Sequence, residues 1–334
     1  MTVWEWFEQR SFHHCDFADL AARGLAAHDA TVSLVLPARN VAGPIASILE
    51  TVNRLNDRSG LLCQVVVVDA DSPDGTANIA RALGAEVYSE NELLPGYGPA
   101  QGKGDAMWRS LSVARGDIVM FADADTADFG EHFVYGTLGP LLLDGDIQFC
   151  KAAYRRPYSS GGEAVADGGG RVTELMAKPL LNFFYPELTG FVQPLAGEFA
   201  ARRELLWSLP FLTGYGVELG ILIDVLSAAG LSALAQVDLG TRQNRHQPLL
   251  DLTRMSSTVL RALARRASLP EQDLMAAGVP GVDALSRPEI YVHAVATDEG
   301  LRLDEYLNPL LERPPLNEVL GAPGVGCVAE KMSR

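Results

Sequence analysis

Short apolar runs without polar alternation recur along the first half of the chain. They lie at residues 32–36, 64–68 and 118–122, and residues 85–88 are predicted to form a further short strand. Uninterrupted runs of this length are typical of strands that are buried on both faces of a sheet. Polar or glycine-rich loops and helical patterns lie between these runs. Helices are predicted over residues 45–55, over a stretch that ends at Leu83, and over residues 105–114. The pattern therefore predicts alternating strands and helices.

The second half is less regular. Strands are predicted at residues 147–154 and 233–239, and helices from Val172 onward and over 218–229 and 249–267. Residues 191–201 and 205–216 have no clear period and predict an irregular, pocket-like region. Beyond Ser268 the chain is rich in Pro and Gly, which predicts a partly ordered tail.

Strands that alternate with helices favour an α/β fold with a parallel, doubly wound sheet. The boundaries predicted from these patterns are an N-terminal arm at 1–30, a nucleotide-binding part at 31–140, an acceptor-binding part at 141–267 and a tail at 268–334. With 334 residues the chain is long enough for one large or two modest domains.

Composition narrows the function. The chain is 48% hydrophobic and 21% charged, with a formal net charge of -15 and a pI near 4.8. This acidity argues against broad binding to nucleic acids or anionic membranes, so any anionic substrate needs a local basic patch. No basic and apolar leader and no long apolar run is present, which predicts a cytoplasmic protein.

Cysteine and histidine are common metal ligands, but the cysteines and the His13–His14 pair of this chain do not predict a metal site. Cys15, Cys63, Cys150 and Cys327 lie far apart without a C-x-x-C pair, which favours reduced thiols over disulfides or a structural metal site. His13 and His14 are adjacent, and neighbouring histidines on a helix diverge. We therefore expect them to be structural or on the surface.

Two aspartates follow the apolar run at 118–122. In open α/β sheets ligands gather at the carboxyl ends of strands, which places Asp123 and Asp125 in the ligand crevice. Residues i and i+2 of an extended segment share a face, so the two carboxylates can hold a divalent cation against a phosphorylated substrate. The alternative is a solvated acidic loop.

Other loops supply partners for a nucleotide. Residues 37–40 and 69–71 end neighbouring strands, where a nucleoside can lie along the sheet edge. Lys103 stands between Gly102 and Gly104, which lets backbone and ammonium approach a pyrophosphate. The spacing fits neither a P-loop nor a dinucleotide fingerprint. A nucleotide sugar is therefore favoured over ATP or NAD.

The glycine run at 168–170 continues into Arg171 and a predicted helix start. Free backbone N–H groups beside a guanidinium form an anion site, and a flexible hinge with a surface arginine is the equal alternative. His246 can complete the coordination of a metal on Asp125, although a single histidine is more often a packing or surface residue.

Taken together, these motifs resemble retaining glycosyltransferases of GT-A fold, with a Rossmann-like, mainly parallel sheet flanked by helices. More narrowly, the chain resembles the actinobacterial glucosyl-3-phosphoglycerate and mannosyl-3-phosphoglycerate synthases. The resemblance covers roughly residues 30–266. It rests on the residues at 35–38, 73–76, 102–106, 123–125, 154–157, 168–175, 193–195, 197–198 and 214–218, and on 312–315 further along the chain.

The resemblance implies a role for each motif. The donor nucleotide would contact Pro37, Ala38, Arg39, Asp71, Lys103, Asp123 and Ala124. A Mg²⁺ or Mn²⁺ ion would bind Asp125 and His246. The acceptor, 3-phosphoglycerate, would contact Gly170, Arg171, Thr173, Tyr215, Arg242, Asn244 and Arg245. Lys103, Asp125 and Glu218 would be catalytic, with the role of Glu218 left open between attack and positioning.

Residues 39–42 read Arg-Asn-Val-Ala where the mycobacterial glucosyl enzymes have Leu-Asn-Glu-Glu. This difference and the altered loop at 242–247 favour a mannosyl enzyme that uses GDP-mannose. The alternatives are a glucosyl enzyme that uses UDP- or GDP-glucose, a nucleotidyltransferase, and a nucleotide-sugar binding protein without turnover. We expect small-molecule substrates and a homodimer, with no nucleic-acid or membrane partner.

Overall fold

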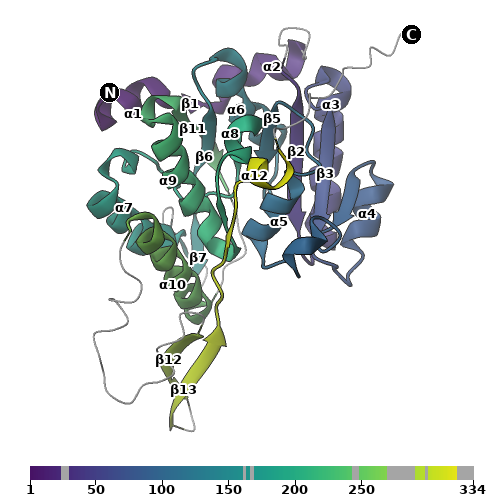
Figure 1. Ribbon diagram of the computed structural model, residues 1–334. Coiled ribbons are helices and arrows are strands. Elements are labelled where there is room, and N and C mark those ends of the chain that lie inside the picture. The colour runs from purple at the N-terminus through teal and green to yellow at the C-terminus, as the bar shows by residue number, and fades with distance from the viewer. Residues whose placement is uncertain are drawn as a thin grey trace.

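A single eight-stranded sheet runs through the computed structural model (Figure 1). Its strand order is β1-β11-β6-β9-β5-β2-β3-β4, and every neighbouring pair is parallel except the two that β9 makes with β5 and β6. The structure describes residues 1–23, 30–160, 163–165, 169–242, 248–268, 290–297 and 300–321. The predicted α/β class with a mainly parallel sheet is confirmed.

The strands of this sheet are β1 (Ser11–His13), β2 (Val32–Ala38), β3 (Gln64–Asp69), β4 (Glu86–Ser89), β5 (Ile118–Phe121), β6 (Phe149–Arg155), β9 (Phe199–Arg202) and β11 (Leu234–Thr241). The helices are α1 (Val3–Arg10), α2 (Ala18–Arg23), α3 (Ala42–Ser59), α4 (Thr76–Ala82), α5 (Lys103–Ser110), α6 (Glu131–Leu143), α7 (Lys178–Phe184), α8 (Arg203–Trp207), α9 (Val217–Ala229), α10 (Leu249–Arg266) and α12 (Leu316–Leu320). In the described part of the chain, no helix is both long and apolar enough to cross a bilayer.

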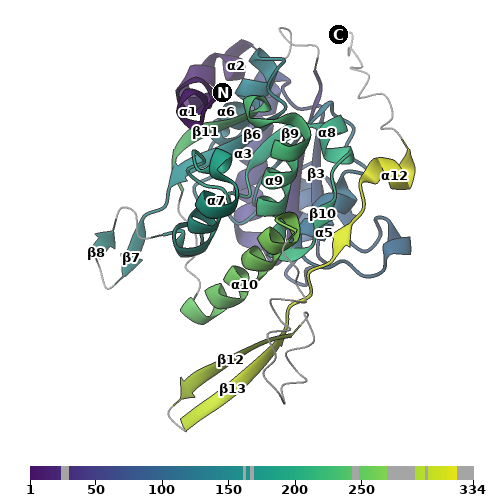
Figure 2. The ribbon, with the colours of Figure 1, turned by 60° about the vertical axis from the view of Figure 1, so that its left-hand side comes forward.

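Successive residues of a strand point to opposite faces, so the apolar runs feed two cores. Val35 of β2 packs in the core with α5 and α9, whereas Leu34 and Leu36 pack in the core with α3 and α6. Figures 1 and 2 show these helices on the two sides of the sheet. Burial on both faces explains why these strands lack polar alternation.

Two elements of the sheet were not predicted. Residues 199–201 fall in a segment predicted to be irregular, yet with Arg202 they form β9, which lies between β5 and β6 in the sheet. Four residues with two alanines carry too little pattern to mark a strand. The N-terminal residues also contribute β1, which pairs with β11, and Trp6 is buried with its indole N–H donating to the Leu234 carbonyl oxygen at 2.8 Å.

The predicted division at residue 140 falls inside α6. Strands from both predicted parts share the one sheet, because β6, β9 and β11 continue it beyond β5. The two predicted parts therefore share the central sheet.

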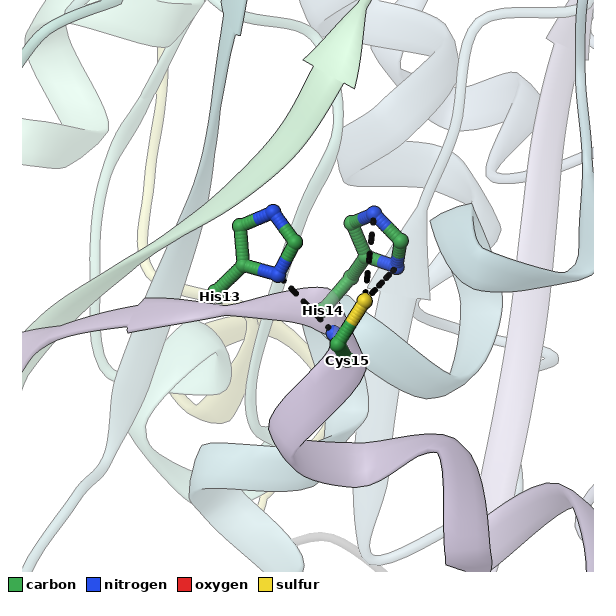
Figure 3. Close-up of side chains that lie close together, drawn as sticks. All are labelled: His13, His14 and Cys15. Carbon is green, nitrogen blue, oxygen red and sulfur yellow. Dashed lines mark hydrogen bonds between the residues drawn. The ribbon is translucent and has the colours of Figure 1, made fainter.

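His13 and His14 lie where β1 ends and a 3₁₀ turn begins, so the helix assumed for them is wrong (Figure 3). Their ring centroids are 4.4 Å apart, and His14 also packs on His132 at 4.8 Å. The His13 Nδ1 atom accepts the backbone N–H of Cys15 at 3.2 Å, which places the proton of the neutral ring on Nε2. This arrangement caps the turn, and the contact with His132 joins it to α6.

The C-terminal segment leaves the body of the molecule and returns. A hairpin of β12 (Ile290–Thr297) and β13 (Gly300–Leu307) projects outward, as Figure 2 shows. The chain then pairs β14 (Glu312–Arg313) with β10 (Phe211–Leu212), and Leu316 of α12 is buried in the core. A smaller hairpin joins β7 (Tyr158–Ser160) and β8 (Glu163–Val165).

Candidate active site

A cavity of about 620 Å³ opens at the carboxyl ends of β2, β3 and β5. Most of the predicted site residues line it. From the predicted donor and metal sets these are Pro37, Ala38, Arg39, Lys103, Asp123, Ala124 and Asp125. From the predicted acceptor and catalytic sets they are Gly170, Arg171, Thr173, Tyr215, Glu218 and Arg242.

Four predicted residues are not among these. Asp71 is exposed, and its carboxylate accepts a hydrogen bond from the Asn91 side chain at 2.9 Å. Asn244, Arg245 and His246 lie outside the described residues.

Lys103 is the centre of an ion-pair chain on the cavity wall. It is the first residue of α5, and its ammonium lies 2.5 Å from Asp123 Oδ1 and 2.7 Å from Glu218 Oε1. Burial lowers the pKa of Lys103, but the two carboxylates outweigh it and hold the pKa well above its ordinary value. Lys103 therefore stays cationic and fixed in position where an anionic leaving group can meet it.

The ion-pair chain continues on the other side of Asp123. Arg242, whose side chain is only 2% exposed, donates from Nη2 to Asp123 Oδ2 at 2.9 Å and from Nη1 to Glu198 Oε2 at 2.6 Å. Glu198 is fully buried and also accepts the Tyr154 hydroxyl at 3.0 Å. Arg242, predicted to contact the acceptor, thus uses both of its terminal nitrogens on protein groups, while its Nε has no partner among the described residues.

Asp125 differs from Asp123 in its accessibility. Its side chain is 62% exposed, and its nearest cation is Arg242 Nη2 at 3.6 Å. Partial desolvation at the cavity wall and the charge of Asp123 raise the pKa of Asp125, while the charges of Arg242 and Lys103 act in the opposite direction. An accessible carboxylate beside another carboxylate fits a divalent cation, because hard oxygen ligands are those that Mg²⁺ and Mn²⁺ prefer.

The geometry of this acidic pair is not the predicted one. Residues 124 and 125 form a turn and are not extended, so the shared face assumed for the pair is wrong. The two carboxylates still converge because Arg242 Nη2 lies between them. Asp123 is neutralised by Lys103 and Arg242, which leaves Asp125 as the carboxylate open to the cavity.

Glycines leave room for this chain of charges. A Cβ at Gly197 would lie 2.2 Å from Asp123 Oδ1 and 2.5 Å from Lys103 Nζ. A Cβ at Gly104 would lie 2.0 Å from the backbone oxygen of Leu212. Gly104 therefore lets α5 pack closely against β10, whereas the sequence suggested that it served approach to a phosphate.

The opposite end of the cavity is basic. Arg171 and the half-buried Arg156 both line it, and Gly170 has a φ of +68°. A Cβ at Gly169 would lie 2.6 Å from the Arg156 carbonyl oxygen, so the glycine permits this close approach. Arg156 belongs to the motif at 154–157, but sequence reasoning gave it no role.

The helix after Arg171 is not the regular α-helix that was predicted. Residues Thr173–Ala177 have π-helical geometry, and α7 adds only Lys178–Phe184. The helical residues nevertheless run without a break from 171 to 184, so the predicted helix follows Arg171 with one π turn in it. π-Helical turns often occur at functional sites.

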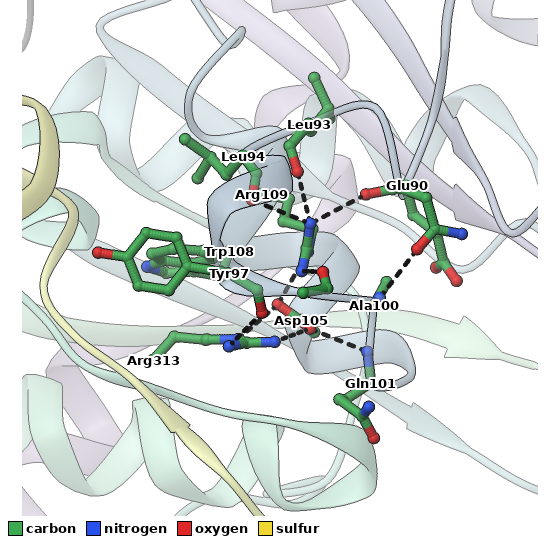
Figure 4. A network of polar contacts seen from close by, with 12 residues as sticks. Glu90, Leu93, Leu94, Tyr97, Ala100, Gln101, Asp105, Trp108, Arg109 and Arg313 are labelled. Carbon is green, nitrogen blue, oxygen red and sulfur yellow. Dashed lines mark hydrogen bonds and ion pairs between the residues drawn. The ribbon is translucent and has the colours of Figure 1, made fainter.

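A second buried charge network lies behind Lys103 (Figure 4). Asp105, on the same helix, accepts from Arg313 Nη2 at 2.6 Å and Nε at 2.9 Å, and from Arg109 Nε at 3.1 Å. Asp105 Oδ2 also accepts the Gln101 backbone N–H at 2.9 Å. The C-terminal segment thus holds the helix that carries Lys103.

The sequence profile of glycosyl transferase family 2 matches residues 33–207, and the chain belongs to this family. It is a glycosyltransferase, as its fold and cavity indicate. A similar protein is the glucosyl-3-phosphoglycerate synthase of Mycolicibacterium paratuberculosis, 44% identical over 269 residues, which cover 80% of this chain and 81% of the relative.

Solved structures agree with this result. The crystal structure of mannosyl-3-phosphoglycerate synthase from Rubrobacter xylanophilus is 59% identical, with a TM-score of 0.86, and the match covers 95% of this chain and 99% of that one. Glucosyl-3-phosphoglycerate synthase from Mycobacterium tuberculosis, in complex with Mn²⁺, UDP-glucose and phosphoglyceric acid, is 40% identical, with a TM-score of 0.73 and coverages of 87% and 92%. The resemblance to the glucosyl- and mannosyl-3-phosphoglycerate synthases is confirmed.

Proposed function

We propose that this enzyme transfers a hexose from a nucleoside diphosphate sugar to 3-phosphoglycerate, with GDP-mannose as the preferred donor and mannosyl-3-phosphoglycerate as the product. The observation that carries the proposal is one cavity lined by two different sets of charged residues. Asp125, Asp123 and Lys103 form the first set, and Arg156 and Arg171 form the second.

The relatives support both substrates. The Mycobacterium tuberculosis enzyme is known with Mn²⁺, UDP-glucose and phosphoglyceric acid together. The Rubrobacter xylanophilus protein with 59% identity is a mannosyl-3-phosphoglycerate synthase. A glucosyl enzyme is the second candidate, because both glucosyl- and mannosyl-3-phosphoglycerate synthases are similar to this chain. The M. paratuberculosis relative, a glucosyl-3-phosphoglycerate synthase, supports this second candidate.

Each charged group has a distinct task in the proposed reaction. Asp125 would hold a divalent cation, which would supply positive charge for the departing diphosphate. The Lys103 ammonium meets the same diphosphate, and Asp123 and Glu218 keep it charged and oriented. Because the Glu218 carboxylate forms an ion pair with Lys103, we propose that Glu218 positions the Lys103 ammonium.

The acceptor end orients the second substrate. The Arg171 guanidinium can grip a phosphate or carboxylate through two parallel hydrogen bonds. Arg156 adds a second cation on the same wall. Holding both substrates in one geometry supplies much of the rate enhancement in such a transfer.

A product assay with a panel of nucleotide sugars tests the proposal. The enzyme with Mg²⁺ or Mn²⁺, 3-phosphoglycerate and GDP-mannose should release GDP and form a phosphorylated glycoside. Faster turnover with UDP- or GDP-glucose would establish the glucosyl enzyme. Release of pyrophosphate would show a nucleotidyltransferase, and no donor consumption would show a binding protein.

We also propose that the protein is a homodimer. The projecting hairpin exposes Leu301, Leu303 and Leu307 at 89%, 70% and 74%, a spacing that puts them on one face of β13. Sedimentation of the full chain should give twice the monomer mass. The replacement of all three leucines by serine should shift it to the monomer.

A further inference from the structure

The nucleoside end of the cavity contains a carboxylate that no step above uses. Pro37, Ala38, Val68 and Ala70 make this end largely apolar. Glu90, which follows β4, also lines the cavity there and is half-buried.

The backbone of Glu90 is held in place by several contacts. Its N–H donates to the Asp69 carbonyl oxygen at 3.0 Å, and its own carbonyl oxygen accepts from Arg109 Nη1 at 3.4 Å (Figure 4). The next residue, Asn91, donates to Asp71 at 2.9 Å and accepts the Ala100 N–H at 2.9 Å. The loop that carries Glu90 is therefore fixed before any ligand enters.

The side chain of Glu90 has no such partner. Within the part of the chain that the structure describes, its carboxylate makes no hydrogen bond and no ion pair. Burial, together with the charges of Asp105 and Asp71, raises its pKa, while Arg39 acts in the opposite direction. A half-buried carboxylate in a rigid loop is suited to accept hydrogen bonds from a ligand.

We propose that Glu90 recognises the base of the donor nucleotide and that this base is guanine. The inference rests on the proposed function, because it takes the cavity to hold a nucleoside diphosphate sugar. An ionised carboxylate only accepts hydrogen bonds, through two adjacent oxygens. Guanine is the common base whose pairing edge presents two adjacent donors, N1–H and the N2 amino group.

Uracil fits this carboxylate poorly. Its pairing edge has a single N3–H between two carbonyl oxygens, so one carboxylate oxygen would face a carbonyl. Arg39 lines the same end of the cavity and supplies the complementary charge for the O6 atom of guanine, which lies beside N1–H. The Glu90 carboxylate would thus accept from the two donors of guanine, and the Arg39 guanidinium would donate to its O6 acceptor.

Calorimetry with GDP, UDP and inosine diphosphate in the presence of Mg²⁺ tests this inference. Inosine diphosphate lacks only the N2 amino group of guanine. The wild-type enzyme should bind GDP about 10- to 100-fold more tightly than UDP and about tenfold more tightly than inosine diphosphate. Glu90→Gln should reduce both ratios toward one, mainly by weakening GDP.

Glu92→Gln is the matched control, because Glu92 is exposed and does not line the cavity. It should leave both ratios unchanged. If Glu90→Gln, with an unaltered thermal unfolding curve, keeps the wild-type preference for GDP over inosine diphosphate, the inference is overturned. Wild-type binding of UDP as tight as that of GDP overturns it as well.

The binding experiment needs neither hexose nor 3-phosphoglycerate, so it separates this inference from the proposed reaction. A preference for GDP that depends on Glu90, without transfer to 3-phosphoglycerate, would overturn the proposed reaction alone. Transfer from GDP-mannose to 3-phosphoglycerate, with a GDP preference that Glu90→Gln leaves unchanged, would overturn the assignment of guanine recognition to Glu90 alone. No nucleotide binding at all would overturn both.

Discussion

Glu198→Gln tests how the buried charge chain supports the metal site. The substitution keeps the side-chain volume but removes the carboxylate that Arg242 binds at 2.6 Å. Removing one partner of a buried pair costs about 3–5 kcal/mol. Since Arg242 keeps Asp123 at 2.9 Å, we expect the lower end, about 3 kcal/mol. For a chain of 334 residues that corresponds to a melting temperature lowered by about 4 °C.

The same variant should also weaken metal binding. Without Glu198 the charge of Arg242 acts fully on Asp123 and on Asp125, whose Oδ1 lies 3.6 Å from Arg242 Nη2. Arg242 then competes with the metal for Asp125. Groups that support metal ligands in this way typically change affinity by about 10- to 100-fold. We expect a rise of that size in the Kd for Mn²⁺.

Calorimetric titration of Mn²⁺ into the GDP complex measures this affinity, and differential scanning calorimetry measures stability. Glu174→Gln is the control, because its ion pair with Lys178 is exposed to solvent and should matter for neither quantity. If Glu198→Gln lowers the melting temperature but leaves the Mn²⁺ affinity unchanged, these ion pairs contribute to stability alone. That result would refute the prediction that they support metal binding.

Other substitutions have separate readouts. Asp125→Ala should abolish Mn²⁺ binding with little loss of stability, and normal titration of the variant would exclude Asp125 as a ligand. Gly197→Ala should eliminate transfer, because its Cβ would lie 2.2 Å from Asp123 Oδ1; activity near wild type would contradict that geometry. Arg171→Ala should weaken 3-phosphoglycerate binding about 10- to 100-fold in calorimetry but leave donor binding intact, and equal losses would argue for a hinge. Burial lowers the pKa of Lys151 to about 8, so the unfolded state binds more protons between pH 8 and 10.5. Urea unfolding should therefore show wild type gaining about 3 kcal/mol relative to Lys151→Met over that range, and a flat difference would count against it.

Much of the sheet could be predicted because its strands are buried on both faces. The runs at β2, β3 and β5 consist almost entirely of apolar residues, and each is followed by the loop that carries site residues. The carboxyl-end rule for ligands then places Asp123 and Lys103 together. Strand β9 was not predicted because its own four residues carry little pattern. Its position is set by pairing with β5 and β6, which lie roughly 80 and 50 residues earlier in the sequence.

The supporting charges could not be predicted for a related reason. Glu198 stands 44 residues from Arg242 in sequence, and nothing local marks the two as partners. Glu90 likewise looks like one more acidic residue in a loop. Only the folded geometry shows which carboxylates are paired, and that the Glu90 carboxylate lines the cavity without a hydrogen-bond partner among the described residues.

The contact between Arg313 and Asp105 joins residues 208 positions apart. During synthesis, every strand of the central sheet has been translated once Thr241 is added, yet Arg313 is still missing. Asp105, on the helix that begins with Lys103, therefore acquires one of its two arginine partners only after every strand of the central sheet has been made. A protein cut short before Arg313 would keep all the strands of the sheet but have an incomplete support for its catalytic lysine, so proteolysis at the far end of the chain can disable chemistry at the start of α5.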